Sequence, residues 1–492
     1  MEESNFIIEN GVLKKHLVQE SVIKIPETVS IIGEGAFENE NCVEKLIIPD
    51  NVKIIEKDAF KGSHIFEIEM GNGVVFIGKC AFENLYTGSD INLSAELKYI
   101  GKGAFRFVRF YNESHTIRIP SSVIKIEDNA FECSEFSEII LDEGIKEIGM
   151  EALSGASIEN ISIPGSVANI NERLFDGCYE LKGVKLNNGI KRIKDYAFWG
   201  CDALEKIEFP NTLCEVGRGV FENCRKLKKI NIISNNDLNI FEYAFENSEI
   251  EDIEIIAKKR LYIREYAFAE LKMLKHVKIF AADYGNIIIE KGAFQECTSL
   301  ESVEIVSASK ITIGERAFED CNYLRKLSVV SQHFPTKIEE QAFLNCTSLS
   351  DVSLSTDIYL YENAFEGCSK LEKINWIGYF NSIKFLKEGN LLHFTEKEVM
   401  DIIKNPEQVE LCSNLNIKSA EHEKKVDIFD DEEDDDNTFD DDDEKKFETR
   451  ENDEILKKIE EINQSIKEIN QGLSQYNSVD VDELIERLWE IL

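Results

Sequence analysis

Short groups of alternating apolar and polar residues recur along most of this chain. In "LEKIEFP", Leu204, Ile207 and Phe209 are separated by charged residues. Side chains on a strand point alternately to opposite faces, so this alternation predicts a β-strand with one buried face. Equivalent strands are predicted at residues 43–49, 158–164, 300–306 and 371–377.

An Ala-Phe pair marks each copy of the pattern and gives its period. Fifteen copies run from Phe37 to Phe365, with Leu153 in place of Phe in one of them. The mean spacing is about 23.4 residues, because 328 residues cover fourteen intervals. This spacing lies in the range of leucine-rich repeats. Strands this short are unstable alone, so we expect them to stack in parallel in a rod or arc about 70 Å long, with one shared core.

A second ordered segment follows each strand, and it has two forms. In the first nine copies it reads V/I/L-x-x-I/V-x-x-x-A/L/V-F/L, as in residues 29–37. From residue 238 onward it contracts to two apolar residues with one residue between them, and the copy at Ile338 fits neither form. The strand-ending proline also disappears after Pro210. We therefore expect two repeat subtypes that meet near residue 230, with a change of curvature there.

The segments "IPETVSIIGEGAF" (25–37) and "AFEGCSKLEKI" (364–374) carry a family resemblance. This pattern resembles the BspA-like, or Treponema-type, leucine-rich repeat, over residues 21 to about 380. The resemblance implies a binding protein, because known members include bacterial and protist surface proteins that attach to host matrix or to other cells. The predicted fold class is a repeat solenoid, a β-rich array of about 15 coils with parallel strands.

The Ala-Phe-x-x-Cys phrase has a structural explanation. Ala suits a tight corner, Phe fills the layer between the two strand segments, and Cys occupies a constricted inward site. We therefore predict reduced core thiols, whereas disulfides or redox pairs between neighbouring coils are the alternative. Seven cysteines share this position: Cys178, Cys201, Cys224, Cys297, Cys321, Cys346 and Cys368.

The sequence contains no recognisable catalytic or metal-binding motif. The twelve cysteines include no close Cys-x-x-Cys pair, and the seven histidines belong to no nucleophile or metal pattern. We predict no cofactor, no metal and no enzyme activity. An enzyme would instead need a deep pocket that interrupts the array.

The two ends of a repeat array must be covered. Asn10-Gly11 lies between two apolar runs and predicts a hairpin, so residues 1–20 are assigned to an N-terminal cap and 21–385 to the solenoid. The segment "TEKEVMDIIKNP" (395–406) begins with a capping box and ends at a proline. It predicts a short helix in a C-terminal cap over residues 386–426.

Residues 427–446 are predicted to form a disordered acidic linker. Residues 427–444 contain thirteen acidic residues and no basic one, so charge repulsion prevents a packed core. Weak binding of basic proteins or divalent cations is the alternative, although the segment lacks the glycine and the ordered alternation of a calcium loop.

The tail, residues 447–492, is predicted to form helices. Its first part has apolar residues spaced 4, 3, 4, 3 and 4 apart, and "DVDELIERLWEIL" (480–492) begins with a capping box. We predict oligomerisation through this tail. A hairpin within one chain, or docking onto a partner, is the alternative. The residues assigned to oligomerisation are Ile455, Ile459, Ile462, Ile466, Ile469 and Leu473.

Charge and hydropathy exclude several classes of partner. The chain has 94 acidic and 56 basic residues, a net charge of −38. Such a surface repels nucleic acid and anionic lipid. No apolar run is long enough for a membrane span. The first residues lack the features of a signal peptide, so the expected location is cytoplasmic; a surface or exported adhesin-like protein, released by a non-standard route, is the alternative.

Leucine-rich repeat proteins commonly bind partners through the strand residue between the two inward positions. In this chain that residue forms a stripe of mixed charge, which suits a protein partner better than a polyanion. We predict a non-enzymatic protein-interaction scaffold. The stripe, called the strand stripe below, contains Ile47, Glu69, Asn92, Arg118, Ile140, Ser162, Lys185, Glu208, Asn231, Glu254, Lys278, Glu304, Ser328, Ser353 and Asn375. The predicted contact residues are ten of these: Glu69, Asn92, Arg118, Ile140, Lys185, Glu208, Asn231, Glu254, Lys278 and Glu304.

Overall fold

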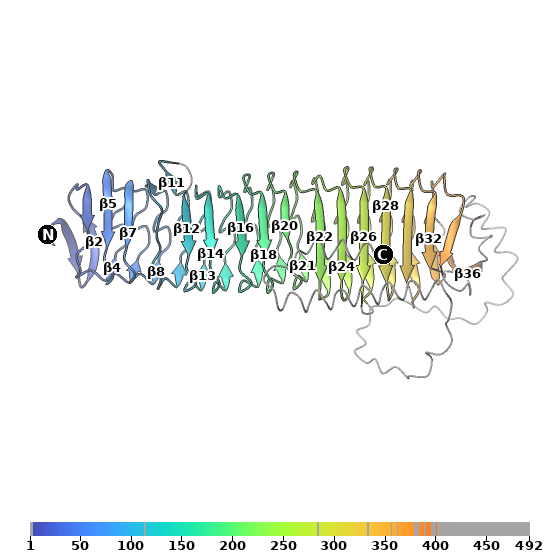
Figure 1. Ribbon diagram of the computed structural model, residues 1–492, viewed down its shortest axis with the longest axis horizontal. Coiled ribbons are helices and arrows are strands. Elements are labelled where there is room, and N and C mark those ends of the chain that lie inside the picture. The colour runs from blue at the N-terminus through green and yellow to red at the C-terminus, as the bar shows by residue number, and fades with distance from the viewer. Residues whose placement is uncertain are drawn as a thin grey trace, which may run out of the picture.

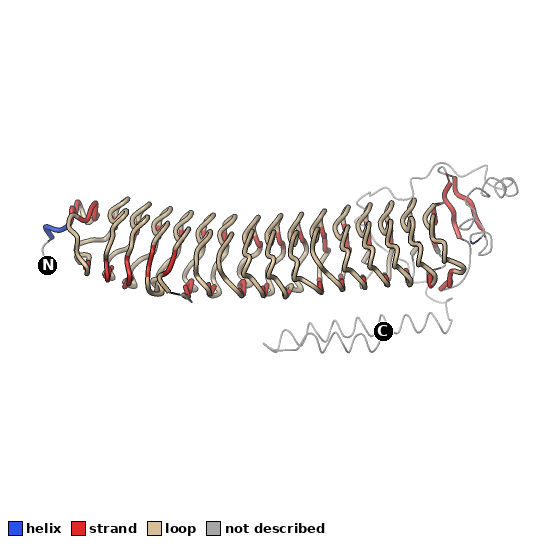
Figure 2. Tube along the Cα trace, turned by 90° about the horizontal axis from the view of Figure 1, so that it is seen from above, coloured by secondary structure: helices blue, strands red, loops and turns tan. Residues whose placement is uncertain are grey.

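The chain folds into a parallel-strand β-solenoid of about 16 turns, in a computed structural model. The turns stack along one nearly straight axis (Figures 1 and 2). The structure describes residues 3–377 apart from 113–114, 283–284, 332–333, 356 and 362, together with strands 383–387 and 390–394 and residue 400.

The first strand row contains the strands predicted from alternation. Its strands are all parallel and form sheets β3-β5-β7, β12-β14, β16-β18-β20 and a seven-stranded sheet from β22 to β34. The four predicted segments coincide with β5, β16, β28 and β34, so these predictions are confirmed. The bounds are β3 Val22–Lys24, β5 Val43–Ile48, β7 Ile65–Met70, β12 Thr116–Ile119, β14 Glu138–Leu141, β16 Asn160–Ile163, β18 Gly183–Leu186, β20 Lys206–Glu208, β22 Lys229–Ser234, β24 Asp252–Ala257, β26 His276–Ala281, β28 Ser302–Ser307, β30 Lys326–Ser331, β32 Asp351–Ser355 and β34 Ile374–Ile377.

The second strand row covers the opposite side of the core. It forms one sheet that ends at β15 and another that begins at β17. The bounds are β4 Ile31–Ile32, β6 Ile54–Ile55, β8 Phe76–Ile77, β10 Tyr99–Ile100, β13 Lys125–Ile126, β15 Glu147–Ile148, β17 Asn169–Ile170, β19 Arg192–Ile193, β21 Glu215–Val216, β23 Leu238–Ile240, β25 Leu261–Ile263, β27 Ile287–Ile289, β29 Ile311–Ile313, β31 Thr336–Ile338 and β33 Ile358–Tyr361. A small separate sheet pairs β9 (Tyr86–Thr87) with β11 (Arg109–Phe110).

The two repeat subtypes meet at β22, as predicted. From β22 to β30 the first-row strands have six residues, and from β23 to β31 the second-row strands have three residues instead of two. Without a proline at the position of Pro210, the strand continues, because each residue keeps its ladder N–H. The expected change of curvature is wrong: both views show the turns continuing in line past this point.

The prediction that the copy at Ile338 fits neither repeat form is also wrong. Thr336 and Ile338 pair with Ile311 and Ile313 in β29, so the copy adopts the contracted form. Thr336 is fully buried in a position that Ile occupies in the neighbouring strand. Its hydroxyl is accommodated because Oγ1 lies 3.1 Å from the Ser355 hydroxyl. A hydrogen bond between the two side chains therefore substitutes for an apolar contact.

The repeat Phe residues stack through the core. Their ring centroids are 4.7 to 5.3 Å apart in two uninterrupted stacks, Phe37 to Phe131 and Phe175 to Phe365. Leu153 lies between the stacks, and both strand rows break between the same two turns, at β14/β16 and β15/β17. The departure from the repeat consensus therefore marks the place where the Phe stack and both sheets are interrupted, while the corner hydrogen bond from Leu153 N–H to the Leu174 carbonyl continues the array.

An antiparallel hairpin lies at each end of the second row. Asn10 and Gly11, both with positive φ, connect β1 (Phe6–Glu9) to β2 (Val12–His16), after the short 3₁₀ helix η1 (Glu3–Asn5). Strand β2 then pairs with β4. At the other end β35 (Ile383–Lys387) pairs with β33 and with β36 (Asn390–Phe394).

Three predicted segments lie outside the described residues. They are the helix at 395–406 apart from Met400, the acidic linker at 427–446 and the helical tail at 447–492. Among the residues that the structure describes, no helix is long and apolar enough to cross a lipid bilayer.

Candidate protein-binding surface

The strand-stripe residues fall in register across neighbouring strands. Ile47 pairs with Glu69 and Arg118 with Ile140, each on the side of the strand opposite to the core. Asn92 is exposed between β7 and β12, outside any strand, so the stripe is interrupted there. The longest uninterrupted part lies on the seven-stranded sheet and contains Asn231, Glu254, Lys278, Glu304, Ser328, Ser353 and Asn375.

In the N-terminal half the charged stripe residues are solvated and paired. Glu69 lies 2.9 Å from Lys45, Arg118 lies 2.6 Å from Asp142, and Glu208 carries a similar exposed pair. The two carboxylates beside Lys45 raise the pKa of its ammonium group. Exposed ion pairs contribute little to stability and are screened by salt. These residues therefore form a solvated charged surface.

A hollow lies where the first row breaks between β14 and β16. Its volume is about 430 Å³, and its lining includes Ile140, Ser162, Lys185 and Glu208. The fold thus brings together stripe residues from four strands, and the lining combines apolar side chains with two acidic and two basic residues. Such a shallow surface suits a side chain of a protein partner better than a deep substrate pocket.

In the C-terminal half the stripe is partly removed from water. Glu254, Lys278 and Glu304 alternate in charge on adjacent strands, and Glu254 is only 5% exposed. Burial lowers the pKa of Lys278, while Glu304 and Glu254 oppose this shift. Charges that are partly desolvated and alternate in sign favour a partner with a complementary pattern.

The prediction missed a second outward row on the same sheet. These residues lie two positions after the stripe residues, at the place that Pro210 occupies in the first subtype. The loss of this proline and its replacement by β-branched or aromatic residues is the signal that could have identified them. We call this set the apolar row: Ile233, Ile256, Phe280, Val306 and Val330.

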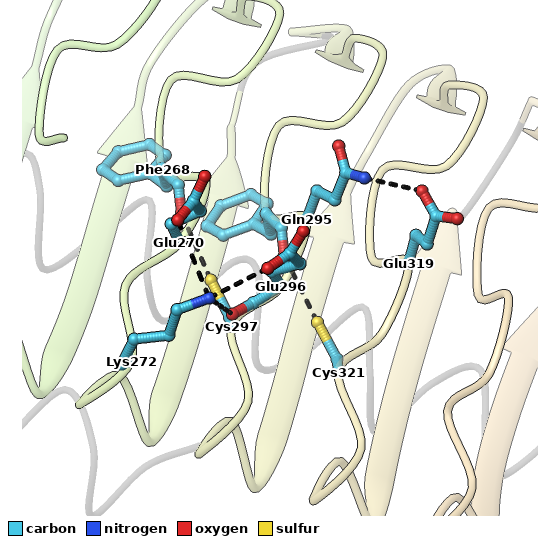
Figure 3. Close-up of polar contacts among 9 residues, drawn as sticks. Phe268, Glu270, Lys272, Gln295, Glu296, Cys297, Glu319 and Cys321 are labelled. Carbon is cyan, nitrogen blue, oxygen red and sulfur yellow. Dashed lines mark hydrogen bonds and ion pairs between the residues drawn. The ribbon is translucent and has the colours of Figure 1, made fainter. Parts of the chain in front are cut away.

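The corner cysteines are structural. Cys297 Sγ donates a hydrogen bond to the Phe268 carbonyl at 3.2 Å, and Cys321 Sγ donates to the Phe294 carbonyl at 3.2 Å (Figure 3). Each thiol therefore satisfies a buried carbonyl of the preceding turn. Burial raises the pKa of Cys297 and of Cys321 well above the usual value, so both remain thiols.

Charged side chains cover the outside of the same corner. Lys272 Nζ lies 3.1 Å from Glu296 and 3.8 Å from Glu270, and Gln295 donates to Glu319 at 2.7 Å (Figure 3). These contacts connect adjacent turns. They form a solvated rim around buried thiols, and neither a nucleophile–base pair nor a metal-ligand set is present among these residues.

One group among the described residues has several metal-ligand atoms close together. Side-chain atoms of Asp58, Cys80 and Glu83 lie within 4.8 Å of one another. Lys61 Nζ already lies 2.7 Å from Glu83 and 3.6 Å from Asp58. Burial, with help from Glu83, raises the pKa of Cys80 to about 11, which keeps it a thiol. Lys57 Nζ also lies 3.2 Å from Asp58, so two ammonium groups balance the two carboxylates and the group is an ion network.

The fold and this surface define a leucine-rich repeat solenoid. The chain belongs to the family described as "BspA type Leucine rich repeat region (6 copies)", whose sequence model matches residues 7–112, 109–182, 168–287 and 263–386. The predicted family is thus confirmed. Comparison with curated proteins found no match.

Solved structures of other leucine-rich repeat proteins are similar to this chain. A leucine-rich repeat protein from Bacteroides ovatus ATCC 8483 is 26% identical, with a TM-score of 0.47, covering 76% of this chain and 97% of its own. A leucine-rich repeat protein from Eubacterium ventriosum ATCC 27560 is 19% identical, with a TM-score of 0.32 and coverages of 60% and 80%. The T. pallidum leucine-rich repeat protein is 22% identical, with a TM-score of 0.28 and coverages of 43% and 79%.

Proposed function

We propose that this protein is a non-enzymatic scaffold that binds a protein partner on the outward face of the first strand row. The observation that carries the proposal is the in-register row Glu254, Lys278 and Glu304. Alternating charges at the strand spacing of about 4.8 Å match a protein surface and repel a uniform polyanion. Leucine-rich repeat solenoids typically mediate protein–protein interaction, which supports this function.

Charge reversal on this row tests the proposal. The full chain is used as bait in cell extract, and captured proteins are identified by mass spectrometry. Lys278→Glu is expected to reduce capture of the specific partner at least about tenfold, because it replaces an attraction by a repulsion in a desolvated setting. Glu265→Lys changes one exposed charge away from this face and serves as the matched control. Equal capture by both variants would contradict the proposal.

The C-terminal helices are proposed to support oligomerisation or docking. Their heptad spacing supports this role, since an apolar seam of this kind must be covered. Light scattering of the full chain and of a chain without residues 427–492 tests it. The same number of chains per particle for both proteins would exclude oligomerisation through the tail.

The cytoplasmic location is likewise a proposal. Cell fractionation tests it, with the protein expected in the soluble cytosolic fraction. Recovery at the cell surface would instead favour the adhesin-like alternative, for which protein binding on the same outward face would still apply.

A further inference from the structure

Three of the five residues of the apolar row are shielded from solvent although they face away from the core, whereas Ile233 and Val306 are partly exposed. Ile256, Phe280 and Val330 are 5%, 4% and 7% exposed, and none of them belongs to the contiguous core cluster between the two strand rows. The alternating neighbours, such as Ile255 and Ile279, do belong to that core. Outward side chains on an open sheet face are ordinarily exposed, so the burial of these three residues makes this face a candidate docking surface.

We propose that residues 455–473 of the same chain bind along the apolar row as a helix. This inference rests on the proposed function, because it assigns the docking segment and places it on the partner-binding face. It also makes the tail a built-in competitor of the partner at β24, β26 and β28.

The apolar side chains of residues 455–473 and those of the apolar row have nearly the same spacing. Heptad positions recur every 3.5 residues on average, so apolar side chains are about 5.2 Å apart along the helix axis. Outward side chains on adjacent parallel strands are about 4.8 Å apart. A helix that lies across the strands can therefore place one Ile at each strand. The six apolar residues from Ile455 to Leu473 span about 27 Å, and the sheet from β22 to β34 spans about 29 Å.

The flanks of the heptad row fit a sheet better than a coiled coil. Stable coiled coils commonly carry complementary charges at the e and g positions. Here those positions are occupied, apart from Lys458, by uncharged residues: Leu456, Asn463, Ser465, Asn470 and Gly472. The helix has three lysines and three glutamates in residues 455–473, so it is neutral and is not repelled by this acidic protein.

The chain is long enough to reach the face without strain. Met400 packs against the core, and 54 residues separate it from Ile455. A flexible chain of that length has a root-mean-square end-to-end distance of about 44 Å. This distance exceeds the span of the seven-stranded sheet, so docking within one chain carries only a modest loop-closure cost.

Hydrogen exchange of the full-length monomer tests the proposal. Amides in residues 455–473 are expected to be protected, and Ile256→Asp is expected to speed their exchange at least about tenfold, because a charge is introduced under the helix. Ile462→Asp is expected to do the same and cannot unfold the solenoid, since it lies outside it. Ile140→Asp, an outward Ile→Asp change on β14, is the matched control and should leave the tail protected.

Two results would overturn docking within one chain. One is exchange in 455–473 that is the same in the native chain, Ile256→Asp and Ile462→Asp. The other is a particle with twice the mass of one chain, in which the protection disappears when dilution separates the two copies. This result would assign the helix to a second copy. Loss of partner capture in Lys278→Glu is a separate readout, so the proposed function can stand when docking fails.

Discussion

Phe198 and Phe221, from consecutive turns, stack with ring centroids 5.3 Å apart and an interplanar angle of 6°. Both side chains are fully buried. The separation is close to the spacing of strands in a sheet, because each turn advances the chain by one strand. One repeat of sequence therefore corresponds to one layer of the core, and every layer supports the next.

Removal of one ring should break this stack locally. Phe221→Ala is expected to lower the free energy of unfolding by about 3–5 kcal/mol, through lost burial and a cavity between two layers. Chemical denaturation followed by circular dichroism measures the change. Phe221→Leu is the matched control, since Leu153 already occupies an equivalent position, and it should cost less than half as much. Equal losses would contradict the burial and cavity argument, because the apolar volume that Leu keeps would then contribute nothing and the whole loss would come from the ring.

Gly189 should not tolerate a side chain. Its φ is +118°, and a Cβ atom there would lie 2.1 Å from the carbonyl oxygen of Gly165 in the preceding turn. Gly189→Ala is expected to cost about 2–4 kcal/mol, because backbone of two turns must separate.

Gly200 provides the control for this change. It also has a positive φ, +67°, but no atom within 4 Å of the added Cβ. Gly200→Ala is expected to cost only about 1–2 kcal/mol, the strain of a left-handed residue. Melting temperatures of both variants give the comparison, and a ranking in the opposite order would contradict the packing argument.

The corner cysteines should be unreactive in the folded protein. Burial raises the pKa of Cys178 to about 12 and that of Cys224 further, so the reactive thiolate is rare near neutral pH. Alkylation at pH 8 is expected to modify exposed Cys42 at least about 100-fold faster than Cys178 or Cys224. Mass spectrometry of digested protein measures the rates. Similar rates would indicate frequent opening of the turns.

We predict that ionisation of the same thiols in the unfolded chain lowers the stability of the folded protein in alkali. In the unfolded chain they ionise near pH 8.5 to 9, whereas in the folded chain they keep their protons to higher pH. The unfolded state therefore binds fewer protons above that range, and stability falls as the pH rises further. Denaturation midpoints should be flat with respect to these groups below pH 8 and decline above pH 9. Replacement of Cys178 and Cys224 by Ala should reduce the alkaline slope.

Thr336 and Ser355 should behave as a coupled pair. Their hydroxyl oxygens lie 3.1 Å apart, and both residues are buried. Thr336→Val is expected to cost about 1 kcal/mol, because it leaves the Ser355 hydroxyl with a weaker set of partners. The double variant Thr336→Val with Ser355→Ala should recover most of that loss. Additive losses in this double-mutant cycle would show that the pair does not interact.

Local residue patterns predicted the repeat architecture well. Alternation at Leu204, Ile207 and Phe209 indicated a strand, and the constant spacing of Ala-Phe indicated the layers, because every turn meets an identical neighbour. The turn at Asn10-Gly11 could also be predicted from the sequence, because a hairpin turn of this type depends on two residues that adopt positive φ.

The candidate surface could be predicted only in part from the sequence. The strand stripe follows from alternation, so the outward positions of Lys278 and Glu304 could be predicted. Their partial burial and the shielding of Ile256 and Phe280 could not, since they depend on which segments lie over the sheet. The placement of Asn92 outside any strand, and of Thr336 inside one, likewise depends on neighbouring turns.

The sequence by itself determined the period, the inward residues and the family, because each is a property of a single turn repeated many times. Only the tertiary structure decided where both strand rows break between the same two turns, at β14/β16 and β15/β17, and which outward residues are hidden from water. The physical reason is that these features are set by contacts between turns and across the face of the sheet, and such contacts join residues that are distant in the chain.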